Sequence, residues 1–239
     1  MKVLGSYERA RIYIDQLYQE SAEAKFHKRK MNPGPVVTIS RQTGIGAATI
    51  CAKLAEYFNK YAIADYKDWT YFDRDLIGKI MEDHNLPDHF RKFLAQEKPT
   101  TIDSWFGEIL GISPSKISLL HKTAQTIMKL AEFGNTIIVG RASNIILSQK
   151  KNAFHVRLIA PLNHRIENAS ALYDVGQKAA AEFIMQEDLE RKNYLLKYFH
   201  KDIDDPLLYH SIINTNFFTL DEIAEMIGHC VIKKFPASF

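Results

Sequence analysis

The sequence lacks the features that would set it apart from ordinary globular proteins. Only two of its 239 residues are cysteines, Cys51 and Cys230, so we expect free thiols in a reducing compartment, the cytoplasm, rather than a disulfide framework. The first residues hold no apolar stretch of signal-peptide length, and no apolar run could span a bilayer. The formal net charge of +3 is too small to indicate general nucleic-acid binding. We therefore expect neither a membrane nor a nucleic-acid partner.

The patterns of a metal centre or a covalent nucleophile are also missing. The histidines do not recur at metal-ligand spacing, and no candidate base adjoins Cys51. We predict no zinc site and no cysteine or histidine nucleophile. Apolar residues make up 46% of the chain, and this length is sufficient for one sizeable core with a small mobile subdomain.

Residues 1–34 differ in pattern from the rest of the chain. The segment Tyr7–Lys30 is rich in helix formers, ends in the basic run His27–Lys30, and is followed by the breaker Asn32–Pro35. We predict a helical extension, followed by one domain over residues 35–239. The basic run is either a solvated helix end or a binding patch, and the extension can serve as a packing or homodimer element.

After this break, short apolar runs alternate with longer amphipathic stretches. The predicted strands are Val36–Ser40, Thr70–Phe72, Thr136–Val139, Phe154–Ile159 and a weaker Ser211–Ile213. Several lack clean alternation, as expected for strands covered on both faces. The alternation of elements predicts an α/β fold whose parallel sheet has about five strands, with helices on both sides. Ligands of such sheets lie beyond the carboxyl ends of the strands.

Four segments carry helix signals. The first is Ile45–Lys60, and the second begins at Ser113 and Pro114 and ends before Gly134–Asn135. The third is the charged stretch Ala179–His200, as one helix or two. The fourth runs from the capping box at Thr219–Glu222 to about Lys234. These helices fill the intervals between and after the predicted strands, which supports the α/β prediction.

The segment Val36–Ala55 has the pattern of a phosphate loop between a strand and a helix. Glycines let successive amides wrap around phosphate oxygens, and the helix dipole faces the anion. The motif G-x-x-x-x-G-K-[ST] is broken, because Arg41 replaces the first glycine and Ala47 the lysine. A tight turn without a ligand fits Gly-x-Gly equally well. The predicted phosphate-binding residues are Thr43, Gly44, Ile45, Gly46, Ala47, Ala48 and Thr49, with Thr49 placed to reach Mg²⁺.

Charged residues follow the other strands. Asp73 could bind sugar hydroxyls, hold a metal, receive a proton or cap the next helix, whereas Asp75 fits a cap or first-turn role. Arg141 follows the third strand and suits a bidentate grip on phosphate. Arg165, after the fourth strand, is either a ligand residue or a surface arginine. Arg191 is the best candidate on the long charged helix.

Taken together, these segments resemble the cytidylate kinase-like family, a branch of the P-loop nucleoside monophosphate kinases. The resemblance rests on TISRQTGIGAATICAKLA, FDRD, IIVGRASNIIL and the stretch from Asp188 to Thr215, and it covers about Val36 to Lys234. It implies a three-layer P-loop NTPase-type parallel sheet flanked by helices. It also implies a helical acceptor-binding insert at about residues 86–112 and a lid at about residues 174–205.

The resemblance implies transfer of the γ-phosphoryl group of ATP, with Mg²⁺, to a nucleoside monophosphate such as CMP. Thr49 matches the metal-associated hydroxyl of the family. The catalytic candidates are Arg41, Arg191 and Asp73, and the substrate-binding candidates are Asp73, Arg141, Arg165 and Asp188.

Three departures from the family pattern keep two functions open. Ala47 stands in place of the phosphate lysine, Ala142 in place of the aspartate of Gly-Arg-Asp, and Ile184–Met185 in place of the first lid Arg-Asp. Phosphoryl transfer depends on cations that offset developing charge, and we hypothesise that Arg41 supplies a substitute. The alternatives are an ATP-dependent kinase and a non-catalytic, nucleotide-binding regulatory domain.

Overall fold

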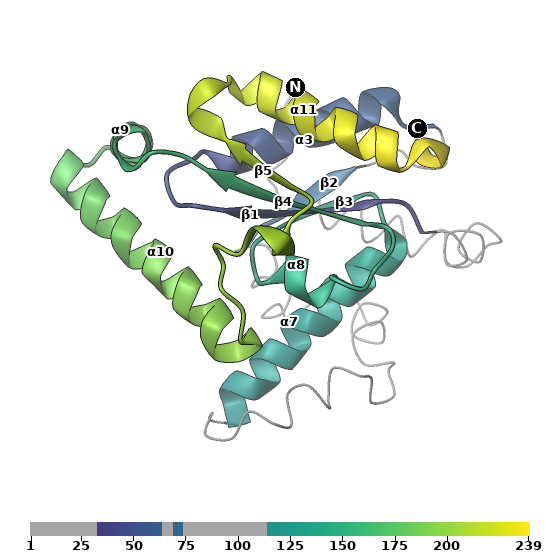
Figure 1. Ribbon diagram of the computed structural model, residues 1–239, viewed down its shortest axis with the longest axis horizontal. Coiled ribbons are helices and arrows are strands. Elements are labelled where there is room, and N and C mark those ends of the chain that lie inside the picture. The colour runs from purple at the N-terminus through teal and green to yellow at the C-terminus, as the bar shows by residue number, and fades with distance from the viewer. Residues whose placement is uncertain (1–32, 64–68, 74–113) are drawn as a thin grey trace, which may run out of the picture.

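A parallel sheet of five strands forms the centre of the computed structural model, which describes residues 33–63, 69–73 and 114–239 (Figure 1). The strands are β1 (Val36–Arg41), β2 (Thr70–Phe72), β3 (Thr136–Val139), β4 (Ala153–Ile159) and β5 (Ser211–Asn214). They lie in the order β2-β3-β1-β4-β5, and every neighbouring pair is parallel. The predicted α/β fold is confirmed, as are all five predicted strands.

The strand order places β1 between β3 and β4. The chain leaves β1 toward β2 on one side of the sheet and later crosses to β4 on the other side. The switch point therefore lies at the carboxyl end of β1, where ligands bind in open α/β sheets. The predicted helix Tyr7–Lys30, the cap residues Asp75 and Ser113, and the predicted insert at residues 86–112 lie outside the described residues.

Strand β1 is buried on both faces. Val37 and Ile39 belong to the main hydrophobic core on one face. On the other face Thr38 shares a hydrogen bond of 2.8 Å with Nδ1 of His155 on β4. A continuous apolar run in the sequence is typical of a strand that is covered by helices on both sides.

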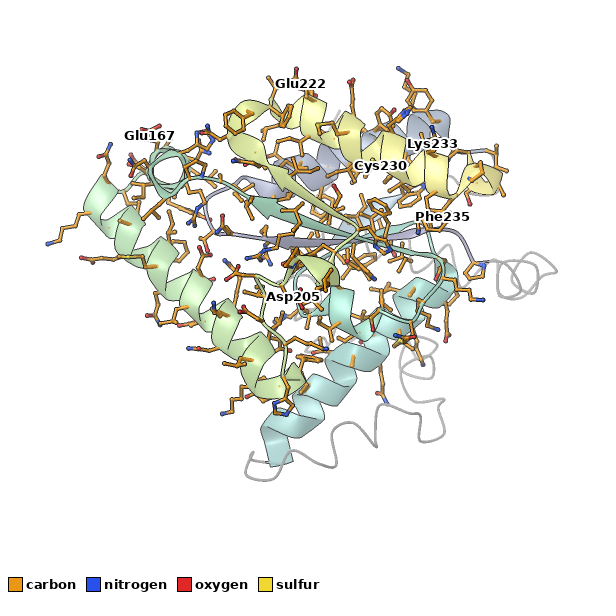
Figure 2. The ribbon with its side chains drawn as sticks, viewed as in Figure 1. Glu167, Asp205, Glu222, Cys230, Lys233 and Phe235 are labelled. Atoms are coloured by element: carbon orange, nitrogen blue, oxygen red, sulfur yellow. The ribbon has the colours of Figure 1, made fainter. Side chains whose placement is uncertain are left out.

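Helices α3 (Ala47–Tyr61) and α11 (Leu220–Lys234) cover one face of the sheet (Figure 1). Their inward apolar residues complete the main core. The predicted capping box at the start of α11 is present, near Glu222 in Figure 2. The backbone N of Glu222 donates to Oγ1 of Thr219 (3.2 Å), and the backbone N of Thr219 donates to Oε2 of Glu222 (2.8 Å).

Helices α7 (Pro114–Phe133) and α8 (Ser143–Ile146) cover the opposite face of the sheet. Helix α7 begins at Pro114, as predicted, because proline fits the first turn of a helix. It ends before Gly134 and Asn135, whose φ values of 74° and 52° are left-handed.

Helix α9 (Leu162–Tyr173) leads into α10 (Gln177–Phe199), which is one continuous helix that runs toward α7 (Figure 1). The inner side of α10 is apolar at both ends. Ile184 packs with α9, and Leu195 and Phe199 pack with α7 and α8. The middle of the same side carries charged residues, namely Glu187, Asp188 and Arg191. Because apolar contacts hold both ends of α10 in place, its charged middle segment lies over the sheet.

Three short 3-10 turns complete the described elements. They are η2 (Pro206–Leu208) before β5, η3 (Thr215–Phe217) after it, and η4 (Pro236–Ser238) after α11. None of the helices in the described ranges is long and apolar enough to cross a membrane.

Candidate functional site

The turn between β1 and α3 has the backbone of a phosphate loop. Gly44 and Gly46 have φ values of 86° and 77°, in the left-handed region that favours glycine. A Cβ on Gly44 would lie 2.5 Å from the carbonyl oxygen of Arg165, so only glycine fits this close approach. Because the left-handed Gly46 is the N-cap, α3 begins at Ala47 and not at the predicted Ile45.

The N-terminus of α3 is open to solvent. Ala48 and Thr49 are exposed and Ala47 is partly exposed, whereas the side chains of Thr43 and Ile45 are buried. The first amides of a helix have no intrahelical acceptor, and with the helix dipole they attract anions. The exposed half of the predicted phosphate-binding segment is therefore suited to bind phosphate through its backbone.

Arg41 ends β1 and extends toward the turn after β3. A Cβ on Gly140 would collide with Nη1 of Arg41, so this glycine makes room for the guanidinium. Burial first, and then the charge of Arg191, lowers the pKa of Arg41 to about 10, while Asp73 opposes this shift. Arg41 therefore keeps its proton at neutral pH, and Asp73 lies near enough to act on it.

The turn after β3 is strained. Gly140, Arg141 and Ala142 all have positive φ values, of 76°, 56° and 55°. For a residue with a Cβ, such a conformation costs about 1–3 kcal/mol, and it persists where the surrounding structure enforces it. This turn brings Arg141 to the site and starts α8 at Ser143.

A cavity of about 170 Å³ lies between the carboxyl ends of β1 and β3 and the inner side of α10. We call it the arginine cavity, because Arg41, Arg141 and Arg191 line it together with two carboxylates, Glu187 and Glu190. Three of the predicted site residues are thus brought together from three different elements. Their excess of positive charge favours an anionic ligand.

Asp188 of α10 contacts the glycine turn directly. Its Oδ1 accepts hydrogen bonds from the backbone N (2.8 Å) and Oγ1 (2.6 Å) of Thr43, and its Oδ2 accepts one from Arg165 (2.6 Å). Arg165 is only 7% exposed and also donates to the carbonyl oxygens of Ala160 (3.0 Å) and Thr43 (3.2 Å). In this structure both residues hold α10 on the turn, and their contact with a substrate stays a prediction.

Arg191 connects the glycine turn with the arginine cavity. Its Nη1 donates to Oγ1 of Thr43 and to Oδ1 of Asp188 (3.1 Å), and its Nη2 donates to Oε2 of Glu187 (2.8 Å). Since Arg191 also lines the cavity, this one side chain contacts both the glycine turn and the cavity.

Two buried side chains next to the sheet, Cys51 and His155, have pKa values that burial shifts away from neutral pH. Burial raises the pKa of the Cys51 thiol to about 12 and lowers the pKa of His155 to about 4. In the described part of the chain, no three His, Cys, Asp or Glu side chains are grouped to hold a metal ion. Mg²⁺ that arrives with nucleotide phosphates needs few protein ligands, and the exposed hydroxyl of Thr49 fits that need.

A second cavity, beyond the ends of β4 and β5, was not predicted. This β4–β5 cavity has a volume of about 410 Å³, and Arg157, Asp204 and Tyr209 are among its lining residues. The buried Arg157 donates to Oγ of Ser40 (2.9 Å) and to Oδ1 of Asp204 (3.0 Å). Ser40 also lines the arginine cavity, so Arg157 links the two. Arg157 itself is the sequence signal that could have revealed this second cavity, because an arginine is unusual inside a strand that is expected to be covered on both faces.

Other lining residues of the arginine cavity were also not predicted, among them Asn144, Glu187, Glu190 and Tyr194. Glu187 could have been found from its i,i+4 spacing to Arg191. Asn144 lies on the four-residue helix α8, which is too short to show a periodic pattern. Nothing in the sequence distinguishes this asparagine from a surface one.

A glycine turn that leads into an open helix N-terminus, at the switch point of a parallel sheet, is the arrangement of a P-loop-type fold. The chain belongs to the cytidylate kinase-like family, because the model of that family matches residues 36–216. The family resemblance expected from the sequence is thereby confirmed.

One solved structure supports the fold, and two further structures are similar at lower TM-scores. A crystal structure of an uncharacterized protein from Eubacterium ventriosum superimposes with a TM-score of 0.65 at 20% identity, covering 83% of this chain and 98% of that one. A shikimate kinase from Bacteroides thetaiotaomicron gives a TM-score of 0.45 at 12% identity, covering 82% and 98% of the two chains. A gluconokinase from Sinorhizobium meliloti gives 0.43 at 13% identity, covering 84% and 93%.

A curated relative is similar over a shorter stretch. The uronate isomerase of Corynebacterium glutamicum is 26% identical over 100 residues, which make up 42% of this chain. The chain spans 19% of the length of that relative.

Proposed function

We propose that the protein transfers the γ-phosphoryl group of ATP to a nucleoside monophosphate, with CMP as the leading acceptor. The observation that supports this most is the convergence of Arg41, Arg141 and Arg191 on one cavity, from which Arg191 also donates to Thr43 of the glycine turn that opens α3. Proteins catalyse phosphoryl transfer mainly by positioning the reactants and by stabilising charge. An arginine cluster next to a helix N-terminus is suited to both tasks.

The glycine turn would bind the donor. In this proposal the amides of residues 43–49 surround the donor phosphates, and the hydroxyl of Thr49 helps to hold Mg²⁺, which neutralises phosphate charge. Arg41 replaces the charge of the lysine that is missing at Ala47. It is suited to this role because it follows β1 directly, keeps its proton at neutral pH and lines the arginine cavity.

The arginine cavity would form part of the acceptor site. Pockets for drug-sized ligands measure about 300–1,000 Å³, so a cavity of about 170 Å³ suits the phosphate and part of the sugar. In this proposal Arg141 and Asp73 position the acceptor, and its base extends toward the predicted insert at residues 86–112. The choice of CMP rests on the family to which the chain belongs.

Helix α10 would serve as the lid, within the predicted lid region at residues 174–205. Arg165 and Asp188 hold it on the glycine turn, and Arg191 offsets charge on the transferring group. An oxygen of the acceptor phosphate attacks the γ-phosphorus in line. The bond from that phosphorus to the β,γ-bridging oxygen breaks, and ADP leaves. No covalent intermediate with the protein forms in this proposal.

A non-catalytic nucleotide-binding domain is the second candidate. Ala47 and Ala142 carry no charge where the family pattern has charged residues. At the position of the first lid arginine, Ile184 is 1% exposed and packs in the contact between α9 and α10. A regulatory domain of this kind would bind nucleotide and respond through the position of α10.

One assay separates the two candidates. The purified protein is given Mg-ATP and each of CMP, UMP, AMP and GMP, and diphosphate formation is measured alongside ATP binding. We expect equal amounts of ADP and a new diphosphate with at least one acceptor, and a loss of about 100-fold or more in kcat/KM in Arg191→Gln. ATP binding without product would favour the second candidate. If the protein neither binds ATP nor forms a diphosphate, both candidate functions are wrong.

A further inference from the structure

Asn144 presents a buried hydrogen-bond donor at the arginine cavity. It belongs to α8, is 5% exposed and lines the cavity. Among the residues that the structure describes, none accepts a hydrogen bond from its Nδ2. A buried donor without an acceptor is unfavourable and rare, because the water that hydrated it in the unfolded chain has not been replaced.

A second asparagine provides the contrast. Asn152, just before β4, is partly buried, and its Nδ2 donates to the carbonyl oxygens of Gly34 (2.9 Å) and Ala131 (3.0 Å). These two bonds tie the segment before β1 and the end of α7 to the loop before β4. The amide of Asn152 is therefore structural, whereas Asn144 lines the cavity and no described residue accepts from its Nδ2.

The position of Asn144 is well defined by its neighbours. Helix α8 starts directly after the strained turn at residues 140–142, and Ile145 of the same helix packs against α7 and α10. Asn144 and Arg141 line the same cavity from adjacent places on the backbone. A ligand gripped by Arg141 would therefore be within reach of Asn144.

The chemistry of a carboxamide restricts the kind of ligand atom to which Asn144 can donate. Arg41, Arg141 and Arg191 already supply charged donors for a phosphate. A carboxamide N–H adds a directed bond but no charge, which suits a neutral acceptor atom. We propose that Asn144 is a substrate-binding residue that donates a hydrogen bond from Nδ2 to a neutral oxygen of the bound nucleotide, either a carbonyl of the base or an oxygen of the sugar. The identity of this ligand rests on the proposed function.

Binding measurements test the contact. Asn144→Leu keeps the volume of the side chain and removes its donor. We expect calorimetric titration to show CMP binding weakened about tenfold or more, and orthophosphate binding changed by less than about twofold. If the substitution weakens the binding of CMP but not of ribose 5-phosphate, the hydrogen bond goes to the base. If it weakens the binding of both, the hydrogen bond goes to the sugar. Unchanged CMP binding, or an equal loss for orthophosphate, would overturn the proposal. Asn152→Leu should leave all three affinities unchanged.

A second measurement needs no ligand. Because none of the described residues accepts from the donor of Asn144, Asn144→Leu should keep or raise the melting temperature, whereas Asn152→Leu should lower it. If Asn144→Leu lowers the melting temperature as much as Asn152→Leu does, the amide of Asn144 stabilises the fold and the proposal is refuted. If the wild-type protein does not bind CMP at all, the proposed function fails, and the melting comparison still decides the role of Asn144.

Discussion

The carboxylate of Asp188 accepts hydrogen bonds from both the backbone N and the hydroxyl of Thr43, at 2.8 and 2.6 Å, although the two residues are 145 positions apart in the sequence. The same carboxylate pairs with Arg165 and Arg191. One side chain of α10 therefore fixes the geometry of the glycine turn. Any movement of this helix must break or remake contacts of the turn.

Removing this carboxylate should destabilise the fold. Asp188→Ala leaves the buried guanidinium of Arg165 without its carboxylate partner, and we expect the free energy of unfolding to fall by about 2–3 kcal/mol. Urea unfolding at neutral pH measures this loss. Glu182→Ala, an exposed acid on the same helix, should change the stability by less than about 0.5 kcal/mol. Equal effects of the two substitutions would show that the Asp188 contacts contribute little.

Arg41 should carry the charge that the turn lacks. We expect Arg41→Ala to weaken ATP binding about tenfold and to lower kcat/KM about 100-fold or more, with partial recovery in Arg41→Lys because the charge returns. Titration calorimetry and the diphosphate assay measure the two effects. The exposed Lys178 of α10 provides a control, since Lys178→Ala removes a cation without touching the site. Unchanged affinity and turnover in Arg41→Ala would refute the substitute-charge hypothesis.

The two glycines of the turn should differ in their tolerance of alanine. Gly46→Ala forces a Cβ into left-handed backbone and should cost about 1–2 kcal/mol in unfolding free energy. Gly44→Ala adds a collision with the carbonyl of Arg165 and should cost at least about 1 kcal/mol more. Chemical unfolding of both variants checks the order. If Gly46→Ala were the more damaging, the close approach of Arg165 would not be the constraint at Gly44.

Stability should fall in mild acid through His155. Burial lowers the pKa of His155 to about 4, below its value of about 6.5 in the unfolded chain. Between these values the unfolded state binds more protons, so this contribution is complete above about pH 6.5 and is lost as the pH falls toward about 4. His210, whose pKa is also lowered by burial, acts in the same direction.

Urea unfolding at two pH values measures this dependence. We expect the free energy of unfolding to drop by about 2 kcal/mol between pH 7 and pH 5 from His155 alone. His155→Gln should flatten the dependence, and the exposed His229→Gln should not. A dependence that is the same in all three proteins would rule out His155 as its source.

The strands, the final helix and the glycine turn could be predicted because each has a local signal. An apolar run marks β1, the Thr219–Glu222 spacing marks the start of α11, and paired glycines mark the turn. Such signals depend on neighbours in the chain, which a single sequence displays. The placement of Arg41 and Arg141 followed from them, since the carboxyl ends of parallel strands meet at one edge of the sheet.

The contacts of α10 could not be predicted in the same way. The bond from Thr43 to Asp188 joins distant segments, and its geometry depends on how α10 packs. The bond from the buried Arg157 to Ser40 joins register partners on β4 and β1, so it depends on the order of the strands. Asn144 carries no sequence pattern, because its significance comes from a buried donor for which residues 33–63, 69–73 and 114–239 supply no acceptor. Tertiary burial gives these residues their roles.

The most direct test of the central claim is the affinity of a bisubstrate analogue in which adenosine and cytidine are joined through five phosphates. If the glycine turn and the arginine cavity hold donor and acceptor side by side, binding of one half of the analogue makes the binding of its other half intramolecular. The analogue should then bind about 100-fold or more tightly than ATP or CMP alone. An affinity no higher than that of ATP would show that the donor and acceptor sites are not adjacent.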